Sequence, residues 1–382
     1  GRAMTNAATA SATWTRAAVF ISLAGLANAA AAQTPGFWTI SGPAGYTYAE
    51  AWSVSPDGRV VGGGSYRPGA PYQAFTWTRQ SGRADFPAVP AGRSGSLVNG
   101  IALDGATWAA DCSSGSSGSS SELRVYRRRA DGGYDDTGIT PLYVATRNGR
   151  ISRDGAVVAG ENFRQVGAFQ ETQVYRWTPE GGHQPLPFLP GVGTSRLGGI
   201  SADGRVIVGY GSAQAFIWRE GEGTSALPAP QFAASAANGL SGDGRWAVGS
   251  ISPQAARWDI AQASYETLPL LQGYARANAL HVSDDGRTVV GTVSNGGFDS
   301  SLFIWREGVG SQLLTEYMRT SGAQIPAGFQ FDNLAAMSAD GLTFVGRGRM
   351  PVTHEPTSWV VTVPAPPSLL LLALSGGIAT RR

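Results

Sequence analysis

The chain has 382 residues, a formal charge of +2 at neutral pH and a single cysteine. Charged residues make up 15% of it, against about 25% in an average soluble domain. The single cysteine excludes an internal disulfide, and the weak charge excludes a strongly basic surface of the kind that binds nucleic acid. The length allows one large repeat domain or two ordinary domains.

An N-terminal targeting segment comes first. After Met4, the expected start, a sparse positive charge precedes the apolar run 17–26, and small residues continue to Ala32. This order is typical of a secretory signal peptide. We therefore expect residues 1–32 to be a signal peptide, cut by signal peptidase between Ala32 and Gln33, and the protein to be exported. A cut after Ala29 is the alternative.

The next feature is the dipeptide Asp-Gly, which recurs at intervals of 40 to 55 residues. A repeat of this length indicates one supersecondary unit copied and stacked. The seven copies begin at Asp57, Asp104, Asp154, Asp203, Asp243, Asp285 and Asp340.

The copy that begins at Ser201 shows what one unit encodes. Asp-Gly predicts a tight two-residue hairpin, because both residues tolerate positive φ. The β-branched run 206–208 predicts a strand that Gly209 ends, and the apolar run 215–218 predicts the next strand, which a tryptophan closes. Most copies keep the serine, the glycine and the tryptophan, whereas the second has Ala102, Ala110 and Tyr126.

Segments rich in leucine and proline follow most of these tryptophans and predict a fourth strand at the edge of each unit. Proline cannot donate to a ladder and is confined to strand edges and starts. Examples are 186–190, 226–228 and 267–270. Four short antiparallel strands at this period form a propeller blade.

We therefore predict an all-β, seven-bladed β-propeller over residues 33–362. The last copy ends near 359–363 without an outer strand of its own, and the segment 37–40 reads as a spare strand. We expect this N-terminal strand to complete the last blade and close the ring, which removes an exposed edge. An open solenoid with capping strands at its ends is the alternative.

The repeated aspartates and tryptophans have a structural interpretation. An aspartate beside glycine bonds its own backbone in a turn, and a tryptophan at one place in each unit packs between blades. Trp52, Trp108 and Trp246 fall outside that register. They are the candidate ligand-binding residues, because function often lies where a repeat departs from its consensus.

Groups for chemistry are few, and we predict no catalytic residue, no metal site and no cofactor. The histidines fall at different places in their repeats, at His183, His281 and His354. None pairs at metal-ligand spacing. Cys112 has no base near it in sequence, and the basic trio 127–129 is read as a solvated strand end rather than a nucleic-acid site.

The C-terminal segment, residues 363–382, has a pattern of its own. Val363, Pro364, Ala365 and Pro366 precede the apolar run 369–379, and Arg381 and Arg382 follow. The run is shorter than the roughly 20 residues of a membrane-spanning helix. It predicts a transient membrane association through this tail.

This tail resembles a PEP-CTERM sorting signal, with Ala365 where that signal has glutamate. The resemblance implies handling by an exosortase, cleavage near the proline motif, and a Gram-negative bacterium that makes exopolysaccharide. The segments 74–77 and 215–218 resemble HAF repeats of extracellular proteins, with Gln73 and Gln214 in place of the histidine. WD40 and kelch repeats share the period but not the residues.

Taken together, the sequence favours an exported propeller of the cell surface or biofilm matrix that acts as a binding or structural module. Its expected partner is an extracellular polysaccharide or an envelope protein. The alternative is a propeller-based polysaccharide lyase or glycoside hydrolase. Three or more carboxylate, histidine, tyrosine or arginine side chains in one mouth of the central channel would favour the enzyme, and a lining of serine, glycine and alanine would favour the module.

Overall fold

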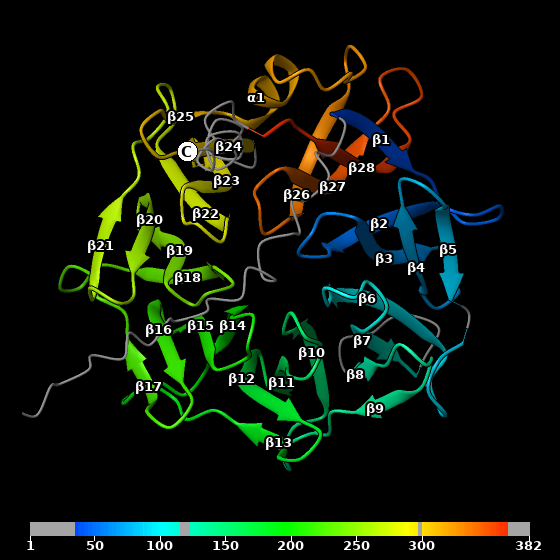
Figure 1. The fold of residues 1–382 in the computed structure, drawn as a ribbon. Helices are drawn as coiled ribbons and strands as arrows, with labels where there is room; N and C mark the ends of the chain where they lie inside the picture. Colours follow the sequence, from blue (N-terminus) through cyan, green and yellow to red (C-terminus); the bar gives the residue numbers. More distant parts are fainter. Residues whose placement is uncertain (1–34, 87, 115–122, 297–299, 366–382) are drawn as a thin grey trace, which may run out of the picture. The chain divides into compact units, whose positions relative to one another are not determined.

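The computed structural model describes residues 35–86, 88–114, 123–296 and 300–365. Residues 1–32 and the end of the tail, including Pro366, Arg381 and Arg382, lie outside this range. The described chain forms seven antiparallel sheets of four strands each. They are arranged radially around a central axis, as Figure 1 shows, and the space between the innermost strands, which holds two cavities, is called the channel. The predicted seven-bladed β-propeller is confirmed.

In six of the blades the chain runs from the channel outward, so that sequence order is also spatial order, and in the seventh the first strand of the chain, β1, takes the outermost place. The inner strands, which precede the Asp-Gly turns, are β2 (Tyr48–Val54), β6 (Gly95–Ile101), β10 (Ala145–Ile151), β14 (Arg196–Ile200), β18 (Ser235–Leu240), β22 (Arg276–Val282) and β26 (Gln330–Met337). The second strands, which follow the turns, are β3 (Val60–Tyr66), β7 (Trp108–Ser113), β11 (Val158–Val166), β15 (Val206–Gly211), β19 (Trp246–Ile251), β23 (Thr288–Ser294) and β27 (Thr343–Arg349).

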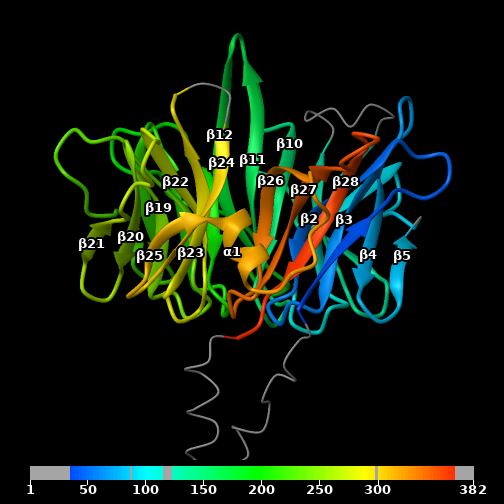
Figure 2. The ribbon, with the colours of Figure 1, turned by 90° about the horizontal axis from the view of Figure 1, so that it is seen from above.

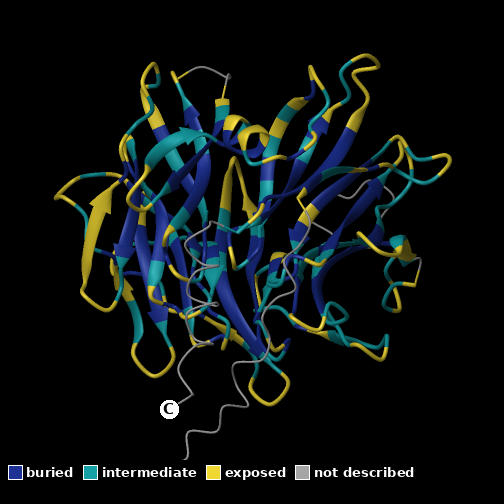
Figure 3. Ribbon diagram, turned by 45° about the horizontal axis from the view of Figure 1, so that its top comes forward, coloured by how far each residue is buried: buried dark blue, intermediate teal, exposed yellow. Residues whose placement is uncertain are grey.

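The outer half of each blade is less buried than the inner half, as the colours of Figure 3 show. The third strands are β4 (Gln73–Thr78), β8 (Arg124–Arg128), β12 (Phe169–Thr178), β16 (Gln214–Arg219), β20 (Gln254–Asp259), β24 (Ser300–Arg306) and β28 (Pro356–Thr362). The outer strands are β5 (Gly82–Phe86), β9 (Tyr134–Asp136), β13 (Gly182–Pro185), β17 (Gly223–Ala226), β21 (Ser264–Thr267) and β25 (Gly310–Leu313), and the helix α1 (Leu314–Thr320) follows the last of these. Figure 2 shows the same blades after a quarter turn.

The N-terminal strand closes the ring. Strand β1 (Gly36–Ile40) pairs antiparallel with β28, with Trp38 opposite Val360, and supplies the outer strand of the seventh blade. Ile40 is buried beside Val360 in the core between the seventh and first blades. The predicted pairing of the two chain ends is confirmed, and every blade has four strands.

The Asp-Gly turns are longer than the predicted two-residue hairpins. In the fourth blade the side chain of Ser201 donates to Asp203 Oδ1 at 2.6 Å and accepts from the main-chain N–H of Val206 at 3.0 Å. The Asp203 carboxylate also accepts from the N–H of Arg205 at 3.0 Å. Only Gly204 has a positive φ, of 70°. The aspartate therefore acts through its carboxylate, as expected, while glycine alone supplies the left-handed conformation.

The glycine six residues after the aspartate lies inside the second strand rather than at its end. A Cβ on Gly209 would overlap the carbonyl oxygen of Arg196 on the inner strand. The inner strand is bulged at this point, with a register shift between Leu197 and Gly199. The bulge brings the two backbones together, and this close approach requires glycine.

The leucine-proline segments end the outer strands rather than forming them. Strand β17 stops at Ala226, and the next residue, Leu227, is buried and donates its N–H to the carbonyl of Ala215 at 3.0 Å. Pro228 then has no N–H to continue the ladder. The outer strand thus lies a few residues earlier than predicted.

Strand register corrects the assignment of the closing tryptophan in the second and seventh blades. In five blades a tryptophan of the third strand faces a small or aliphatic residue of the second, as Trp218 faces Ile207. In the second blade the residue types are exchanged, because Trp108 on β7 faces Arg128 on β8. Tyr126 lies two residues before Arg128 on the same strand. In the seventh blade, Trp359 likewise lies two residues before the position that faces the second strand's Phe344.

Candidate functional site

The channel is lined by the inner strands, and one layer of it departs from the repeat. The residue four positions before each Asp-Gly aspartate is small in five blades, and is an arginine or a histidine in the other two. The layer consists of Ser53, Gly100, Arg150, Gly199, Gly239, His281 and Ala336. Neither Arg150 nor its pairing with His281 was predicted from the sequence. Aligning the seven copies on their aspartates would have shown both.

Two cavities lie in the channel, and all seven residues of this layer line the second of them. The first lies on the side of the channel away from the Asp-Gly turns and is called the loop-side cavity. It has a volume of about 460 Å³ and is lined by Trp52, Asn148 and Asn333, among others. The turn-side cavity, of about 200 Å³, lies toward the Asp-Gly turns and is lined by His281 and by glycines of the inner strands. Arg150 and Asn99 line both cavities. Arg150 therefore lies where the two spaces meet.

The Arg150 guanidinium makes no hydrogen bond or ion pair with any described residue. Burial in the channel lowers its pKa, while the negative charges of Asp111 and Glu161 act in the opposite direction. Because an arginine stays protonated at neutral pH whatever its surroundings, the middle of the channel carries a positive charge. That charge is available to a ligand in either cavity.

His281 also faces the channel and is neutral. Burial lowers its pKa to about 3, the positive charge of Arg150 acts in the same direction, and a hydrogen bond to the backbone of Ala335 acts against both. The imidazole can therefore donate or accept a hydrogen bond at neutral pH, but it adds no charge.

Asp111 lines the loop-side cavity, and its carboxylate also holds the next blade in place. Asp111 is 4% exposed and accepts the main-chain N–H groups of Asn148 and Gly149 at 2.8 and 3.2 Å. Asn148 is at the bulge of β10 and has a positive φ of 58°. Burial raises the pKa of Asp111 to about 6. Its carboxylate is thus engaged with backbone donors between the second and third blades.

Glu161 has the same role between the third and fourth blades. It accepts the N–H of Leu197 at 2.9 Å and the Nδ2 of Asn148 at 3.0 Å. Arg147 and Arg196 lie 3.5 and 3.7 Å from its carboxylate. Both buried acids are therefore committed to contacts between blades.

The turn-side mouth is narrowed by a circle of hydrogen bonds between neighbouring turns. In five of the seven junctions, the residue before the aspartate donates its N–H to the carbonyl of its counterpart in the next blade. These bonds run from Leu103 to Arg153, Arg153 to Ala202, Ala202 to Gly242, Asp284 to Ala339 and Ala339 to Pro56.

The two remaining junctions of the circle differ. Gly242 donates instead to the Asp284 carboxylate at 2.8 Å, and Pro56 has no N–H to donate to the second blade. Asp284 also pairs with the Arg153 side chain, which reaches it from the third blade. The charges at this mouth are therefore satisfied by each other.

The three candidate tryptophans do not come together. Trp52 is 38% exposed and lines the loop-side cavity. Trp246 packs against the turn at Gly286 of the next blade, between the guanidinium groups of Arg245 and Arg257. Of the three, Trp52 alone presents an aromatic face to the channel.

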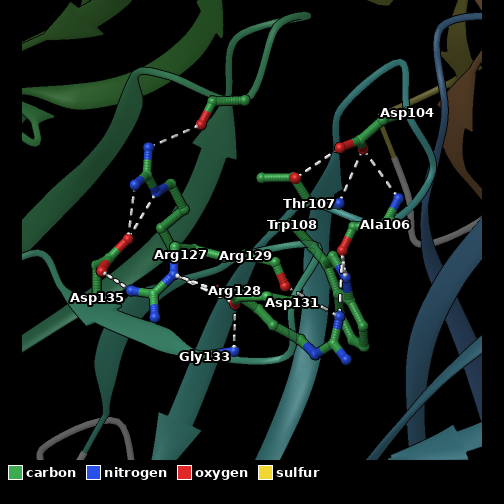
Figure 4. Close-up of polar contacts among 11 residues, drawn as sticks. Asp104, Ala106, Thr107, Trp108, Arg127, Arg128, Arg129, Asp131, Gly133 and Asp135 are labelled. Atoms are coloured by element: carbon green, nitrogen blue, oxygen red, sulfur yellow. Dashed lines mark hydrogen bonds and ion pairs between the residues drawn. The ribbon is translucent and has the colours of Figure 1, made fainter.

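Trp108 is 1% exposed and belongs to the core cluster between the first and second blades. The guanidinium of Arg128 lies 4.5 Å from its ring centroid, and Phe86 packs edge-on against it. Figure 4 shows Arg128 beside the indole, with both side chains directed toward the carbonyl of Ala106. A ligand could not reach this indole without displacing Arg128.

The basic trio 127–129 is largely paired rather than simply solvated. Arg127 bonds Asp135 at 2.8 Å and the carbonyl of Gly155 in the next blade at 3.3 Å. Arg129 pairs with Asp131 and Asp135 (Figure 4). With each positive charge matched or stacked, the trio does not form a basic surface.

The other candidate groups are apart from the channel. His183, on the outer strand β13, stacks on Tyr175 and faces the carbonyl of Thr137 at 2.8 Å. His354 lies in the loop before β28. Cys112 is buried, and burial raises the pKa of its thiol. Within the described ranges no three histidine, cysteine, aspartate or glutamate side chains gather as metal ligands.

No protein-family model matches the chain, and no curated protein matches it either. Several solved structures share its fold. Oligogalacturonate lyase in complex with manganese has a TM-score of 0.55 at 12% identity, with 87% of this chain and 97% of that chain covered. YCF48 bound to D1 peptide has a TM-score of 0.51 at 15% identity, with 87% and 98% covered.

A further structure, the β-propeller domain of the Trilobed protease from Pyrococcus furiosus, has a TM-score of 0.53 at 11% identity and covers 83% of this chain and 95% of that one. It is described as having an open velcro topology, whereas here β1 completes the last blade. At such low identities these similarities establish the propeller fold alone.

The residues that line the channel partly meet both criteria that were set from the sequence, the one for an enzyme and the one for a binding module. Arg150, Arg153, His281 and Asp284 line the turn-side cavity, which is the number that favours an enzyme, yet Arg153 and Asp284 are paired with each other. The rest of the layer is serine, glycine and alanine, as a binding module requires. No helix in the described ranges is long and apolar enough to cross a membrane.

Proposed function

We propose that the protein is an exported propeller that binds a polysaccharide in the loop-side mouth of its channel. The observation that carries the proposal is that Trp52 and Arg150 line one cavity. An exposed indole offers a flat apolar face for a sugar ring, and the neighbouring asparagines and arginine offer hydrogen bonds to its hydroxyls. An envelope protein is the other partner that such a cavity and rim would fit.

Export belongs to the same proposal. The signal peptide at 1–32 and the PEP-CTERM-like tail support delivery to the cell surface or matrix, with signal peptidase and exosortase as processing enzymes. Val363 is buried and bonds the carbonyl of Leu342 at 2.9 Å, so we expect cleavage of the tail beyond this residue. N-terminal sequencing and intact mass of surface-extracted protein test this. A product that still begins before Gln33 and ends at Arg382 would contradict it.

The binding proposal is tested with a glycan array and the purified protein. We expect Trp52→Ala to weaken binding to the retained polysaccharide about tenfold, the worth of one stacked aromatic. Phe232→Ala is the matched control, because Phe232 is 97% exposed in the loop between β17 and β18 and lines neither cavity. Equal losses in both variants, or no retained polysaccharide, would contradict binding in the channel.

A polysaccharide lyase is the second candidate, and the observation that favours it is the presence of Arg150 and His281 in one cavity. In a lyase, an arginine would neutralise a uronate carboxylate and a base would remove the neighbouring proton. With a pKa of about 3, His281 is a weak base. The unsaturated product absorbs ultraviolet light, so its absence after prolonged incubation with bound acidic polysaccharide would exclude this candidate.

A further inference from the structure

Arg150 differs from the arginines that join the blades. Arg127, Arg176 and Arg257 each donate to the carbonyl of a turn glycine in the next blade, at 3.3, 2.9 and 2.6 Å. Each also has an acidic partner, and each lies against a tryptophan of the next blade. Arg150 has none of these contacts within the described chain.

The position of Arg150 is also unlike that of an arginine in a seam between blades. Two of its counterparts in the layer, Gly199 and Gly239, lie where neighbouring inner strands approach closely. A Cβ on either glycine would overlap the backbone of the next inner strand. A long cationic side chain at this place is directed into the channel space, where it lines both cavities. It makes no hydrogen bond or ion pair with a neighbouring blade within the described chain.

The negative charges nearest to Arg150 do not neutralise it. Asp111 and Glu161 influence its pKa, but both acids have other partners. Asp111 accepts backbone N–H groups of the next blade, and Glu161 accepts the N–H of Leu197 and the Nδ2 of Asn148. A desolvated cation without a bonded partner favours an anion. A planar carboxylate matches the guanidinium, because it can accept two parallel N–H bonds.

We infer that the ligand of the loop-side cavity is an acidic polysaccharide, with the carboxylate of a uronate residue bound by Arg150 and its ring against Trp52. This inference rests on the proposed function and specifies its substrate class. A neutral glycan would leave the guanidinium without a bonded partner, so the site discriminates against it.

The test compares three probes with the full purified protein by calorimetry: polygalacturonate, its methyl ester, and a neutral glucan. The ester keeps the sugar chain of the acid but replaces each carboxylate with an uncharged methyl ester, so it lacks the charge that Arg150 is expected to bind. We expect polygalacturonate to bind at least about tenfold more tightly than the ester, the range of a charge-assisted hydrogen bond. Equal binding of acid and ester would overturn the inference but leave the proposed function intact, whereas no binding of any probe would remove both.

Arg150→Gln should abolish the preference for the acid. Arg150→Lys keeps the positive charge but cannot donate two parallel N–H bonds to a carboxylate, so it should retain a fraction of the preference. Arg205→Gln is the matched control, because the Arg205 side chain is 70% exposed on a turn outside the channel. A preference that survives Arg150→Gln, or is lost equally in Arg205→Gln, would place anion binding elsewhere and overturn the inference.

Folding is monitored in the same variants. Because Arg150 bonds no described residue, we expect Arg150→Gln to melt at the wild-type temperature or above. A clear loss of stability would show that Arg150 supports the fold, and would contradict its assignment to a ligand.

Discussion

The seams between blades and the channel use the same residue types to different ends. In a seam, Arg257 is buried, bonds two glutamates and the carbonyl of Gly286, and covers a tryptophan. In the channel, the side chain of Arg150 lines two cavities and forms no hydrogen bond or ion pair with a described residue. A charged side chain in a seam is explained by its neighbours, whereas one in the channel is explained by what enters it.

The second blade shows that the packing of a seam can be kept while its sequence changes. Trp108 supplies from the second strand the indole that other blades supply from the third, and Arg128 covers it. The exchange keeps an aromatic ring in the core. A departure from the repeat can therefore be a rearranged core, and it marks a functional residue only where the side chain also reaches a cavity, as that of Trp52 does.

The largest effect on stability is expected from a substitution where two neighbouring blades approach most closely. Gly286 has a φ of 73°, and a Cβ there would overlap the indole of Trp246 in the preceding blade. Gly286→Ala should cost about 3 kcal/mol of unfolding free energy, measured in urea. Gly308→Ala is the control, since Gly308 has a φ of 76° with open space around it, and should cost about 1 kcal/mol. Equal costs would mean that the packing of Trp246 contributes nothing.

The next comparison sets a seam arginine against the channel arginine. Arg257→Met removes one partner of a buried pair and leaves the carbonyl of Gly286 without its donor, so it should cost about 2 to 3 kcal/mol. Arg150→Gln should cost nothing by the same measurement. If both variants lost equal stability, the distinction between seam and channel would fail.

A pH dependence tests the buried acid between the second and third blades. Because the pKa of Asp111 is raised to about 6, the folded protein binds more protons than the unfolded chain between about pH 4 and 6. Its contribution to stability therefore falls as pH rises through this window, by about 3 kcal/mol in all. The difference in stability between wild type and Asp111→Asn should follow this slope. A difference that is constant from pH 4 to 8 would contradict the assigned pKa.

The smallest expected effect concerns the turns. Ser201→Ala removes the hydroxyl that bonds Asp203 and Val206 and should cost about 1 kcal/mol. Ala102→Ser in the second blade should gain little, because Asp104 is already bonded by Thr107 at 2.6 Å. A large gain there would show that the serine, rather than the completed network, sets the stability of the turn.

The fold could be predicted because its signals are local. Each strand or turn is indicated by residues close together in sequence, namely the Asp-Gly pairs, the β-branched runs and the spare strand at 37–40. Closure of the ring follows because the spare strand pairs with the last blade. The errors arose where three-dimensional register decides, as with Gly209, whose place inside a strand depends on a bulge opposite it. The site was half visible, through Trp52. Arg150 was hidden because nothing in its own segment shows that its neighbours around the ring are small.

The central claim is that ligand binds in the channel between Trp52 and Arg150, and that the seams are structural. A crystal structure of the protein with an oligogalacturonate tests it most directly. The account predicts a uronate carboxylate within hydrogen-bonding distance of the Arg150 guanidinium, with its sugar ring on the indole of Trp52. A ligand seated on the outer strands or in a seam, with Arg150 untouched, would contradict it.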